Sequence, residues 1–313
     1  MKAPGFWAKR GLLAYLLAPF GAITAAITAR RVKKPSFAPG IKVICVGNAG
    51  VGGAGKTVVA LDLLARLPGR RFALTRGYRG RLAGPVLVNP TLHTAEDVGD
   101  EALLLAATAP TILAHDRAAG ARLALAEGAT TIIMDDGLQN PSLAKTLSLL
   151  VIDGGYGFGN FFLLPAGPLR EPVAAAAARV QAAVLIGEDE TGALSRLPAT
   201  LPVLRARLVP ASETELRGRK VVAFAGIGRP EKFFASVRAL GGDPVATHEF
   251  PDHHVYRASD AARLLGAAAS EGALLVTTAK DFVKLPDTLR AASAVVTVRL
   301  HWDDEAALER LLA

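Results

Sequence analysis

A glycine-rich segment directly after an apolar run stands out in the N-terminal half of the 313-residue sequence. Residues 41–57 read IKVICVGNAGVGGAGKT, in which four residues separate Gly50 from Gly55-Lys56-Thr57. This spacing is typical of a phosphate-binding loop, where glycines let backbone N–H groups wrap around phosphate oxygens without a Cβ in the way. The sequence therefore predicts a nucleotide-binding loop made of Gly50, Gly52, Gly53, Ala54, Gly55, Lys56 and Thr57.

The two residues that close this loop are expected to carry its chemistry. Lys56 would neutralise the outer phosphates, and Thr57 would offer its hydroxyl to Mg²⁺. A helix predicted over 56–67 would point its positive dipole end at the bound anion. The alternative is a glycine-rich turn without function. It is disfavoured because a strand before the loop and a helix after it are the context that a phosphate loop requires.

Apolar strand-like runs alternate with helical patterns from residue 41 onward, which predicts a parallel sheet with helices on both faces. The expected fold class is α/β, with a doubly wound, P-loop NTPase-like domain over 31–210. Residues 211–313 are expected to form a second, smaller α/β domain, because a polar hinge at 211–219 separates the two series. Residues 200–210 are interpreted as an extended connector. Further helices are predicted over 96–108, 116–127, 230–240 and 258–269 and from 303 onward. The default place for a site is the cleft between the domains.

Residues 11–29 carry no charge and are flanked by Lys9-Arg10 and by RRVKK at 30–34. As a helix rising about 1.5 Å per residue, this segment would match the thickness of a bilayer core. It could span a membrane or lie in its interface; a secretory signal is disfavoured because a phosphate loop needs cytosolic nucleotide. A buried core helix is the remaining alternative. Residues 1–30 are predicted to be a membrane-associated helix, with the rest of the chain in the cytoplasm.

The net charge of +8 and the pI near 9.8 suit an anionic partner. Nucleic acid is the least favoured one, because the sequence has no basic stripe interleaved with aromatic residues and no zinc-ligand spacing. Cys45 is the single cysteine and lies within an apolar run. No internal disulfide is possible, which fits a reducing compartment.

Acidic residues lie at the end of one predicted strand and at the start of one predicted helix. Asp135 and Asp136 end the apolar run TTIIMDDG, where a Mg²⁺-holding carboxylate lies beside a phosphate loop; without that loop a helix cap would be preferred. Asp100 begins an apolar-periodic helix in VGDEALLL, so capping is its favoured interpretation from the residues alone. In FPDHHVY, residues 250–256, His253 and His254 point in different directions, so at most one is expected to be chemical.

Two loops combine basic and aromatic residues. TRGYRG, residues 75–80, places Arg76 and Tyr78 just past a predicted strand. GFGNFFLLPAGPLREP, residues 157–172, ends in Arg170 and Glu171. Each loop could be a packed crossover, or it could form the rim of a binding site with its arginine facing phosphate.

Together these stretches resemble the tetraacyldisaccharide 4'-kinase family of lipid A biosynthesis. The likeness covers nearly the whole chain and rests on the order of its motifs. They are the N-terminal apolar helix, VGN…GGAGKT, RGY.G, GDE, DDGLQ, GN…LPAGPLRE, AGIG.P..FF, DHH.Y and T.KD..KL.

The resemblance implies an ATP- and Mg²⁺-dependent kinase that phosphorylates the 4'-hydroxyl of an acylated disaccharide 1-phosphate at the cytoplasmic face of the inner membrane. Asp100 matches the family's catalytic aspartate and His253 the histidine paired with it, while Asp135 and Asp136 match the pair implicated in Mg²⁺ binding and catalysis. Lys56 is a further predicted catalytic residue, and Thr57 a further metal ligand. The residues expected to bind substrate are Arg76, Tyr78, Arg117, Gln139, Arg170 and Glu171.

Some positions depart from the family pattern. Asn140 stands where the family commonly has His, and Ala279 where it has Glu, which affects only contacts around the site. A rival prediction is a membrane-recruited ATPase switch that binds a protein partner. Many such proteins carry a second lysine just after the first glycine of the loop, and this chain has Val51 there. The kinase prediction involves a lipid acceptor and the membrane surface, without nucleic acid or an obligate protein partner.

Overall fold

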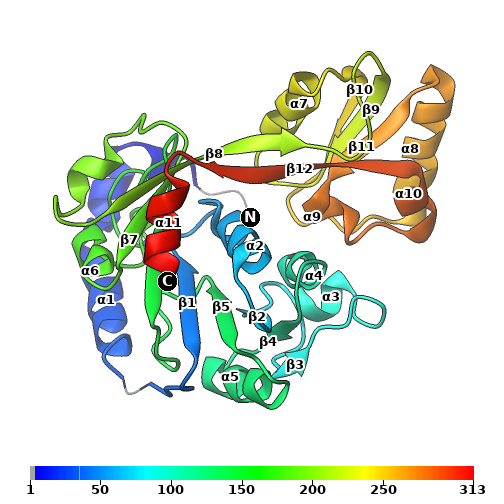
Figure 1. Cartoon of the computed structure of the whole chain (residues 1–313). Coiled ribbons are helices and arrows are strands. Elements are labelled where there is room, and N and C mark those ends of the chain that lie inside the picture. The colour runs from blue at the N-terminus through cyan, green and yellow to red at the C-terminus, as the bar shows by residue number, and fades with distance from the viewer. Residues whose placement is uncertain (1–3, 35) are drawn as a thin grey trace.

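The structure, a computed structural model, describes residues 4–34 and 36–313. Its centre is a twelve-stranded sheet in the order β10-β9-β11-β12-β8-β7-β6-β1-β5-β2-β4-β3 (Figure 1). The pairings are parallel except β12 with β8 and β3 with β4. The strands are β1 (Lys42–Gly47), β2 (Arg71–Thr75), β3 (Val86–Leu87), β4 (Thr111–Leu113), β5 (Thr131–Asp135), β6 (Leu147–Asp153), β7 (Ala182–Ile186), β8 (Val203–Ala211), β9 (Lys220–Ala225), β10 (Asp243–Glu249), β11 (Leu274–Thr278) and β12 (Ser293–Trp302).

Helices cover both faces of the sheet, as the alternating pattern predicts. In β1, Cys45 faces a cluster that includes Ala121 of α5, while Ile44 faces a cluster that includes Leu63 of α2. Successive strand residues therefore pack on opposite faces of the sheet, and both faces are buried under helices. The predicted doubly wound α/β fold class is confirmed. The helices are α1 (Leu12–Arg31), α2 (Lys56–Arg66), α3 (Ala95–Val98), α4 (Asp100–Ala106), α5 (Arg117–Ala126), α6 (Val173–Ala177), α7 (Pro230–Ala239), α8 (Ala258–Glu271), α9 (Ala279–Phe282), α10 (Asp287–Ala292) and α11 (Glu305–Leu312), with short 3₁₀ turns at Gly5–Ala8 and Ala193–Arg196.

The segment interpreted from sequence as an extended connector is strand β8. Its first half pairs with β7, and its second half pairs antiparallel with β12, from Ala206 opposite Trp302 to Ala211 opposite Thr297. The two long strands run side by side from the larger part of the molecule, which contains β1 to β7, to the smaller part, which contains β9 to β11 (Figure 1). The backbone hydrogen bonds of this segment are made within the sheet, so the link is a two-stranded ribbon instead of a free linker.

The C-terminal residues pack on the larger part of the molecule. Leu308 and Leu312 of α11 belong to the same hydrophobic cluster as Val59 and Leu63 of α2. The smaller part has its own clusters on the two faces of β9, built from α7 on one face and from α8 and α10 on the other. The domain boundary after residue 210 stays a prediction. Helix α11 follows this boundary in sequence but packs on the larger part of the molecule.

A single helix over 96–108 is not what the structure contains. The segment forms α3 and α4, which are separated at Gly99, where φ is +84° and ψ is 148°. A Cβ on Gly99 would lie 2.4 Å from the carbonyl oxygen of Tyr78, so only glycine fits this close approach. The break places Asp100 at the first position of a new helix instead of within a longer one.

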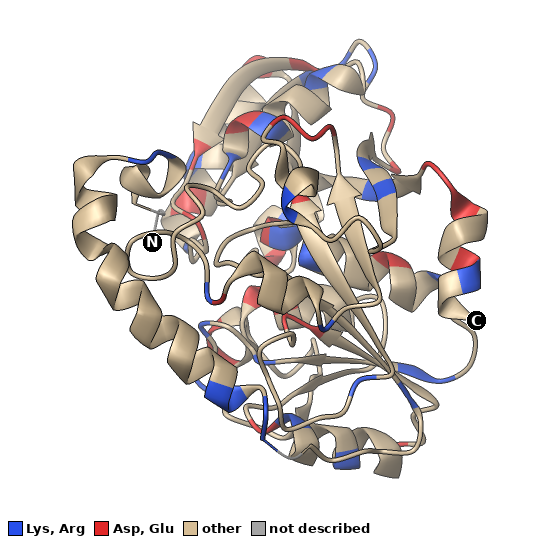
Figure 2. Cartoon of the chain, turned by 90° about the vertical axis from the view of Figure 1, so that its left-hand side faces the viewer, with Lys and Arg blue, Asp and Glu red and all other residues tan. Residues whose placement is uncertain are grey.

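Helix α1 lies along the surface of the larger part, with Lys and Arg residues at its C-terminal end (Figure 2). One side of it is held by the loop at 162–170: the hydroxyl of Thr24 donates to the Leu164 carbonyl at 2.7 Å, and that of Thr28 donates to the Arg170 carbonyl at 3.0 Å. Its other side exposes large apolar side chains. The buried core helix is therefore excluded, and α1 has the length and composition of a membrane-crossing helix. The exposed apolar residues are Leu12, Leu13, Tyr15, Leu16, Phe20, Ile23 and Ile27.

Candidate active site

The glycine-rich loop and the end of β5 meet at the carboxyl edge of the sheet. Lys56 begins α2, and its ammonium group donates to the Gly52 carbonyl at 3.2 Å and lies 3.8 Å from an oxygen of Asp136. The next residue, Thr57, donates its hydroxyl to Oδ2 of Asp135 at 3.1 Å. Loop, helix N-terminus and carboxylates therefore form one anion-binding corner that has acidic groups beside it.

Asp135 is suited to a divalent cation. Its side chain is buried, and its Oδ1 atom has no hydrogen-bond partner within the described residues. Burial, together with the nearby charge of Glu101, raises the pKa of Asp135 to about 7. A buried carboxylate oxygen without a partner, next to a threonine hydroxyl, fits the hard oxygen ligands that Mg²⁺ prefers.

Asp136 belongs to a separate network with Arg170. The guanidinium contacts both oxygens of Asp136 at 3.0 and 3.1 Å and donates to Oε1 of Gln139 at 3.2 Å. Gln139 in turn donates to Glu171 at 2.7 Å, and Arg179 donates to the same carboxylate at 2.8 Å. Burial would raise the pKa of Asp136, but the charges of Lys56 and Arg170 outweigh burial and lower it. The network fixes the Arg170 fork at the edge of the loop.

Asp100 and His253 meet although 153 positions separate them in sequence. Nδ1 of His253 lies 2.9 Å from both carboxylate oxygens of Asp100, a residue that is 4% exposed. His253 follows β10 in the smaller part and has φ of +63°, a left-handed conformation that non-glycine residues seldom adopt. The contact therefore joins the two parts of the molecule across the space next to the phosphate loop.

The remaining predicted residues are brought to the same region to different degrees. The ring of Tyr78 packs edge-on against His253 with ring centroids 5.7 Å apart, and its side chain is largely exposed. Arg76 is exposed. Arg117 is buried at the start of α5, donates to the Ala114 carbonyl, and has its pKa lowered to about 10 by burial. Arg117 is thus a buried cation, while Arg76 and Tyr78 are open to a ligand.

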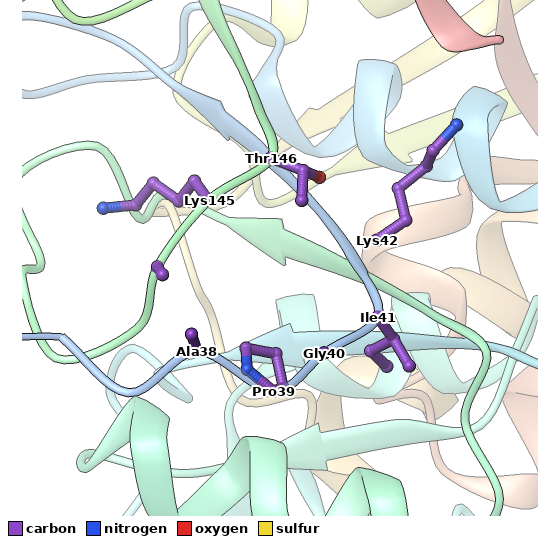
Figure 3. A pocket seen from close by; sticks show the side chains of 8 residues that line it. Ala38, Pro39, Gly40, Ile41, Lys42, Lys145 and Thr146 are labelled. Carbon is purple, nitrogen blue, oxygen red and sulfur yellow. The ribbon is translucent and has the colours of Figure 1, made fainter.

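A separate hollow of about 310 Å³ lies at the opposite end of the sheet (Figure 3). Its lining includes Ile41 and Lys42 at the start of β1 and Thr146 just before β6. Parallel strands carry the phosphate loop at their other ends, so this hollow has no part in the arrangement described above.

Comparison with known proteins assigns the chain to a family. Residues 13–313 match the family described as tetraacyldisaccharide-1-P 4'-kinase. The chain belongs to this family. Tetraacyldisaccharide 4'-kinases of Gluconacetobacter diazotrophicus and Methylorubrum populi are 54% and 55% identical to it, over the full chain and over 97% and 98% of the relatives.

The fold matches a solved kinase as well. The crystal structure of LpxK from Aquifex aeolicus in complex with ATP superposes with a TM-score of 0.77 at 27% identity, covering 96% of this chain and 98% of that one. The chain is therefore an ATP-dependent tetraacyldisaccharide 4'-kinase, a phosphotransferase of lipid A biosynthesis. The rival prediction of an ATPase switch is not favoured.

Four charged residues of the kinase surround the Asp100 to His253 contact. Sequence reasoning noted Asp252 only as a neighbour that could tune the histidine, and it gave the other three no role in the site. Lys280 lies 3.8 Å and Lys284 3.6 Å from Asp100, and Asp252 lies 3.5 Å from Nε2 of His253. Glu101 is the fourth; its pKa is raised by burial. The motif T.KD..KL contains both lysines, and their four-residue spacing could have placed them on one side of a helical segment.

Of the two departures from the family pattern, Asn140 has a local role in this kinase. The side-chain oxygen of Asn140 accepts hydrogen bonds from the backbone N–H and the hydroxyl of Ser142, so it stabilises the turn after Gln139. Ala279 begins α9, whose N-cap is supplied by Thr278 through a hydrogen bond from the N–H of Asp281.

The raised pKa of Asp135 predicts a pH dependence of stability. Between pH of about 4 and about 7 the unfolded chain loses this proton while the folded chain keeps it, so the free energy of unfolding falls as pH rises. Asp135→Asn is expected to raise Tm at pH 8, without nucleotide or Mg²⁺, by about 2–4 °C per kcal/mol recovered, and to change it little at pH 5. Thermal unfolding at both pH values checks this, with the exposed Asp243→Asn as control. Equal Tm changes at both pH values would contradict it.

Proposed function

We propose that the cleft beside the phosphate loop transfers the γ-phosphoryl group of ATP to the 4'-hydroxyl of tetraacyldisaccharide 1-phosphate. The observation that carries this assignment of the site is the 2.9 Å contact between Asp100 and His253 next to the loop. An ionised carboxylate beside the phosphates is the group needed to receive the proton of a sugar hydroxyl. The O4'–P bond forms, the bond from phosphorus to the β,γ-bridging oxygen breaks, and the hydroxyl proton passes to Asp100.

The order of these events follows from the charge on Asp100. Burial alone would raise its pKa, but the hydrogen bond to His253 and the nearby lysines outweigh burial and lower the pKa to about 2. Such a carboxylate is fully ionised at neutral pH and only weakly basic. Because phosphoryl transfer passes through a loose transition state, the hydroxyl needs to be oriented early and deprotonated late. Asp100 serves this role best by accepting the hydrogen bond first and the proton last.

Lys56 and the loop amides bind the β- and γ-phosphates, and Thr57 and Asp135 would hold Mg²⁺. The metal would neutralise charge that develops on the phosphate oxygens. The buried, unpartnered Oδ1 of Asp135 supports this assignment. Within the described residues no group of three or more His, Cys, Asp and Glu side chains is arranged as a metal site, so the nucleotide and water would complete the ligand set.

The acceptor is expected to approach from the side of Arg170 and Tyr78. Arg170 is held in a fixed orientation by Asp136 and Gln139, so its remaining N–H groups can bind an anionic or polyhydroxyl group without loss of side-chain freedom. Glu171 supports this arrangement through Gln139. Arg76 and Arg117 are proposed to add positive charge for the anionic disaccharide.

Helix α1 would place the kinase on the cytoplasmic face of the inner membrane. Its exposed apolar side matches the acyl chains of the substrate, and Arg30 and Arg31 in its last turn match anionic headgroups. Thr28 joins α1 directly to the backbone of Arg170, so a helix anchored in lipid would lie next to the acceptor site. We infer no obligate protein partner for this reaction.

Three substitutions on the exposed side of α1, Leu16→Gln, Phe20→Gln and Ile23→Gln, test this arrangement. We expect the combined variant to move from the membrane fraction toward the soluble fraction and to raise KM for the lipid more than KM for ATP. The Thr24 and Thr28 contacts stay intact, which a deletion of residues 1–30 would not allow. Fractionation and steady-state kinetics measure both effects. Unchanged partitioning would show that another surface anchors the chain.

The activity itself is tested with γ-labelled ATP and a lipid extract that contains the tetraacyldisaccharide 1-phosphate. The label should move to the organic phase, and ATP should be consumed only when the lipid is present. ATP hydrolysis that depends on an added protein, with no labelled lipid, would contradict the kinase assignment of the site.

A further inference from the structure

Two lysines from the smaller part of the molecule face the buried carboxylate of Asp100. The Nζ atoms of Lys280 and Lys284 lie 3.8 and 3.6 Å from Oδ2 of Asp100. Together with His253, they place three cationic or protonatable groups from one part of the molecule around one carboxylate from the other. The same groups also contact Asp252 and Asp281, so Asp100 lies in a cluster of three carboxylates and three basic side chains.

Lys284 is a fixed, buried cation. Its side chain is 5% exposed, and its ammonium group lies 3.1 Å from Oδ1 of Asp281. Asp281 is itself fully buried and held by the N–H of Gly226 at 2.9 Å and the hydroxyl of Thr278 at 2.8 Å. Lys284 makes no hydrogen bond of good geometry within the described residues. It therefore interacts with Asp281 and Asp100 through its charge, at 3.1 and 3.6 Å.

Lys280 connects the carboxylate to the histidine loop. It donates to Oδ1 of Asp252 at 3.3 Å, and Oδ2 of Asp252 lies 3.5 Å from Nε2 of His253. The carbonyl of Asp252 also accepts a hydrogen bond from Arg79 at 3.2 Å. Lys280 therefore holds both ends of the contact, Asp100 directly and His253 through Asp252.

We propose that Lys280 and Lys284 are positioning residues for phosphoryl transfer, which hold the Asp100 carboxylate against His253. The inference rests on the proposed function of the site. Burial alone would favour a neutral carboxyl group at this place, and the two lysines counter it because opposite charges this close favour the ionised form. Neither lysine needs to touch the nucleotide or the acceptor for this role.

The charges around Asp100 decide how the proposal is tested by pH. Asp100 faces His253, Lys280 and Lys284 from the smaller part and Glu101 from its own helix, and Glu101 is in turn influenced by Lys56 at the start of α2. Removing either lysine is expected to raise the pKa of Asp100, and removing Lys280 should raise it more than removing Lys284. The acid limb of the kcat/KM profile should then move to higher pH.

The test compares Lys284→Met, Lys284→Arg and Lys280→Met with wild type in the lipid kinase assay. The matched control is Lys232→Met, which removes an exposed lysine of α7 in the same part of the molecule. We expect Lys284→Met to lower kcat by about 10- to 100-fold, less than the 10²- to 10⁴-fold contribution of a proton acceptor as a whole. KM for ATP should stay within about twofold, because the loop is untouched. Lys284→Arg should restore the acid limb of wild type, since it keeps the charge.

The outcomes separate this inference from the assignment of the site. A wild-type enzyme that labels no lipid would remove the proposed function and with it the inference. A wild-type enzyme that labels lipid, with Lys284→Met and Lys280→Met matching Lys232→Met in kcat and pH profile, would overturn the inference alone. A loss of kcat without a shifted acid limb, unrepaired by Lys284→Arg, would mean a purely structural role and would overturn it too. Should Lys284→Met fail to fold, Lys280→Met decides by the same criteria, because its side chain is 23% exposed.

Discussion

Replacing Lys56 by Ala is expected to abolish phosphoryl transfer while the chain stays folded. The side chain is 11% exposed, but it makes only one hydrogen bond, to the Gly52 carbonyl, and one longer contact with Asp136, and it lies outside the hydrophobic clusters of the core. Its charge is proposed to stabilise the moving phosphoryl group, and losing one such group costs at least about 10²- to 10³-fold in kcat. Transfer of labelled phosphate to lipid measures the loss.

Two controls keep this result specific. Circular dichroism and the thermal unfolding midpoint should match wild type, and Lys232→Ala, an exposed lysine of α7, should retain full activity. Lys56→Ala activity within a few-fold of wild type would show that the glycine-rich loop does not hold the transferred phosphate.

Asp100→Ala and His253→Ala are each expected to lower kcat strongly, and the double variant should be little worse than the worse single one. The two side chains share one contact of 2.9 Å, so removing either disables the same proton acceptor. The expected loss is about 10²- to 10⁴-fold for Asp100, and smaller for His253, which acts through it. A double-mutant cycle at saturating ATP and lipid measures the coupling.

Asp100→Ala also leaves Lys280 and Lys284 facing a site without its carboxylate. Asp100→Asn is therefore measured as well, because it keeps the size of the side chain while removing its charge. Losses that multiply in the double variant would mean that the two residues act independently. A nearly normal Asp100→Asn enzyme would return this residue to the role of a helix N-terminal acid.

Features set by local residue order could be predicted from the sequence. The spacing of Gly50 and Gly55-Lys56-Thr57, and the alternation of apolar runs with helical patterns, identify the loop and the doubly wound sheet because both depend on short-range periodicity. The acids at 135 and 136 follow the same logic, since the carboxyl ends of parallel strands share one edge. The resemblance to a family added catalytic roles for two residues. The residues alone favour Asp100 as a helix-capping acid, and they do not single out His253 from His254.

The missed features depend on contacts distant in sequence. Nothing near Gly99 predicts that the Tyr78 carbonyl approaches it closely enough to divide a helix. Residues 200–210 were interpreted as a connector because the strand that completes their hydrogen bonds, β12, lies about 90 residues further along. Lys280 and Lys284 gain meaning only when the smaller part brings them to Asp100.

The pairing of β8 with β12 has an architectural consequence. Ala211 lies directly opposite Thr297, and directly opposed residues of antiparallel strands have Cα atoms about 4.5–5.5 Å apart. Residues 212–296 therefore leave and re-enter the larger part through adjacent points, in the manner of an insertion into a β-hairpin. A short turn joining Ala211 to Thr297 would restore that hairpin with α11 in place. The segment that carries His253, Lys280 and Lys284 is therefore an insertion, in topological terms, into the part of the chain that holds the phosphate loop.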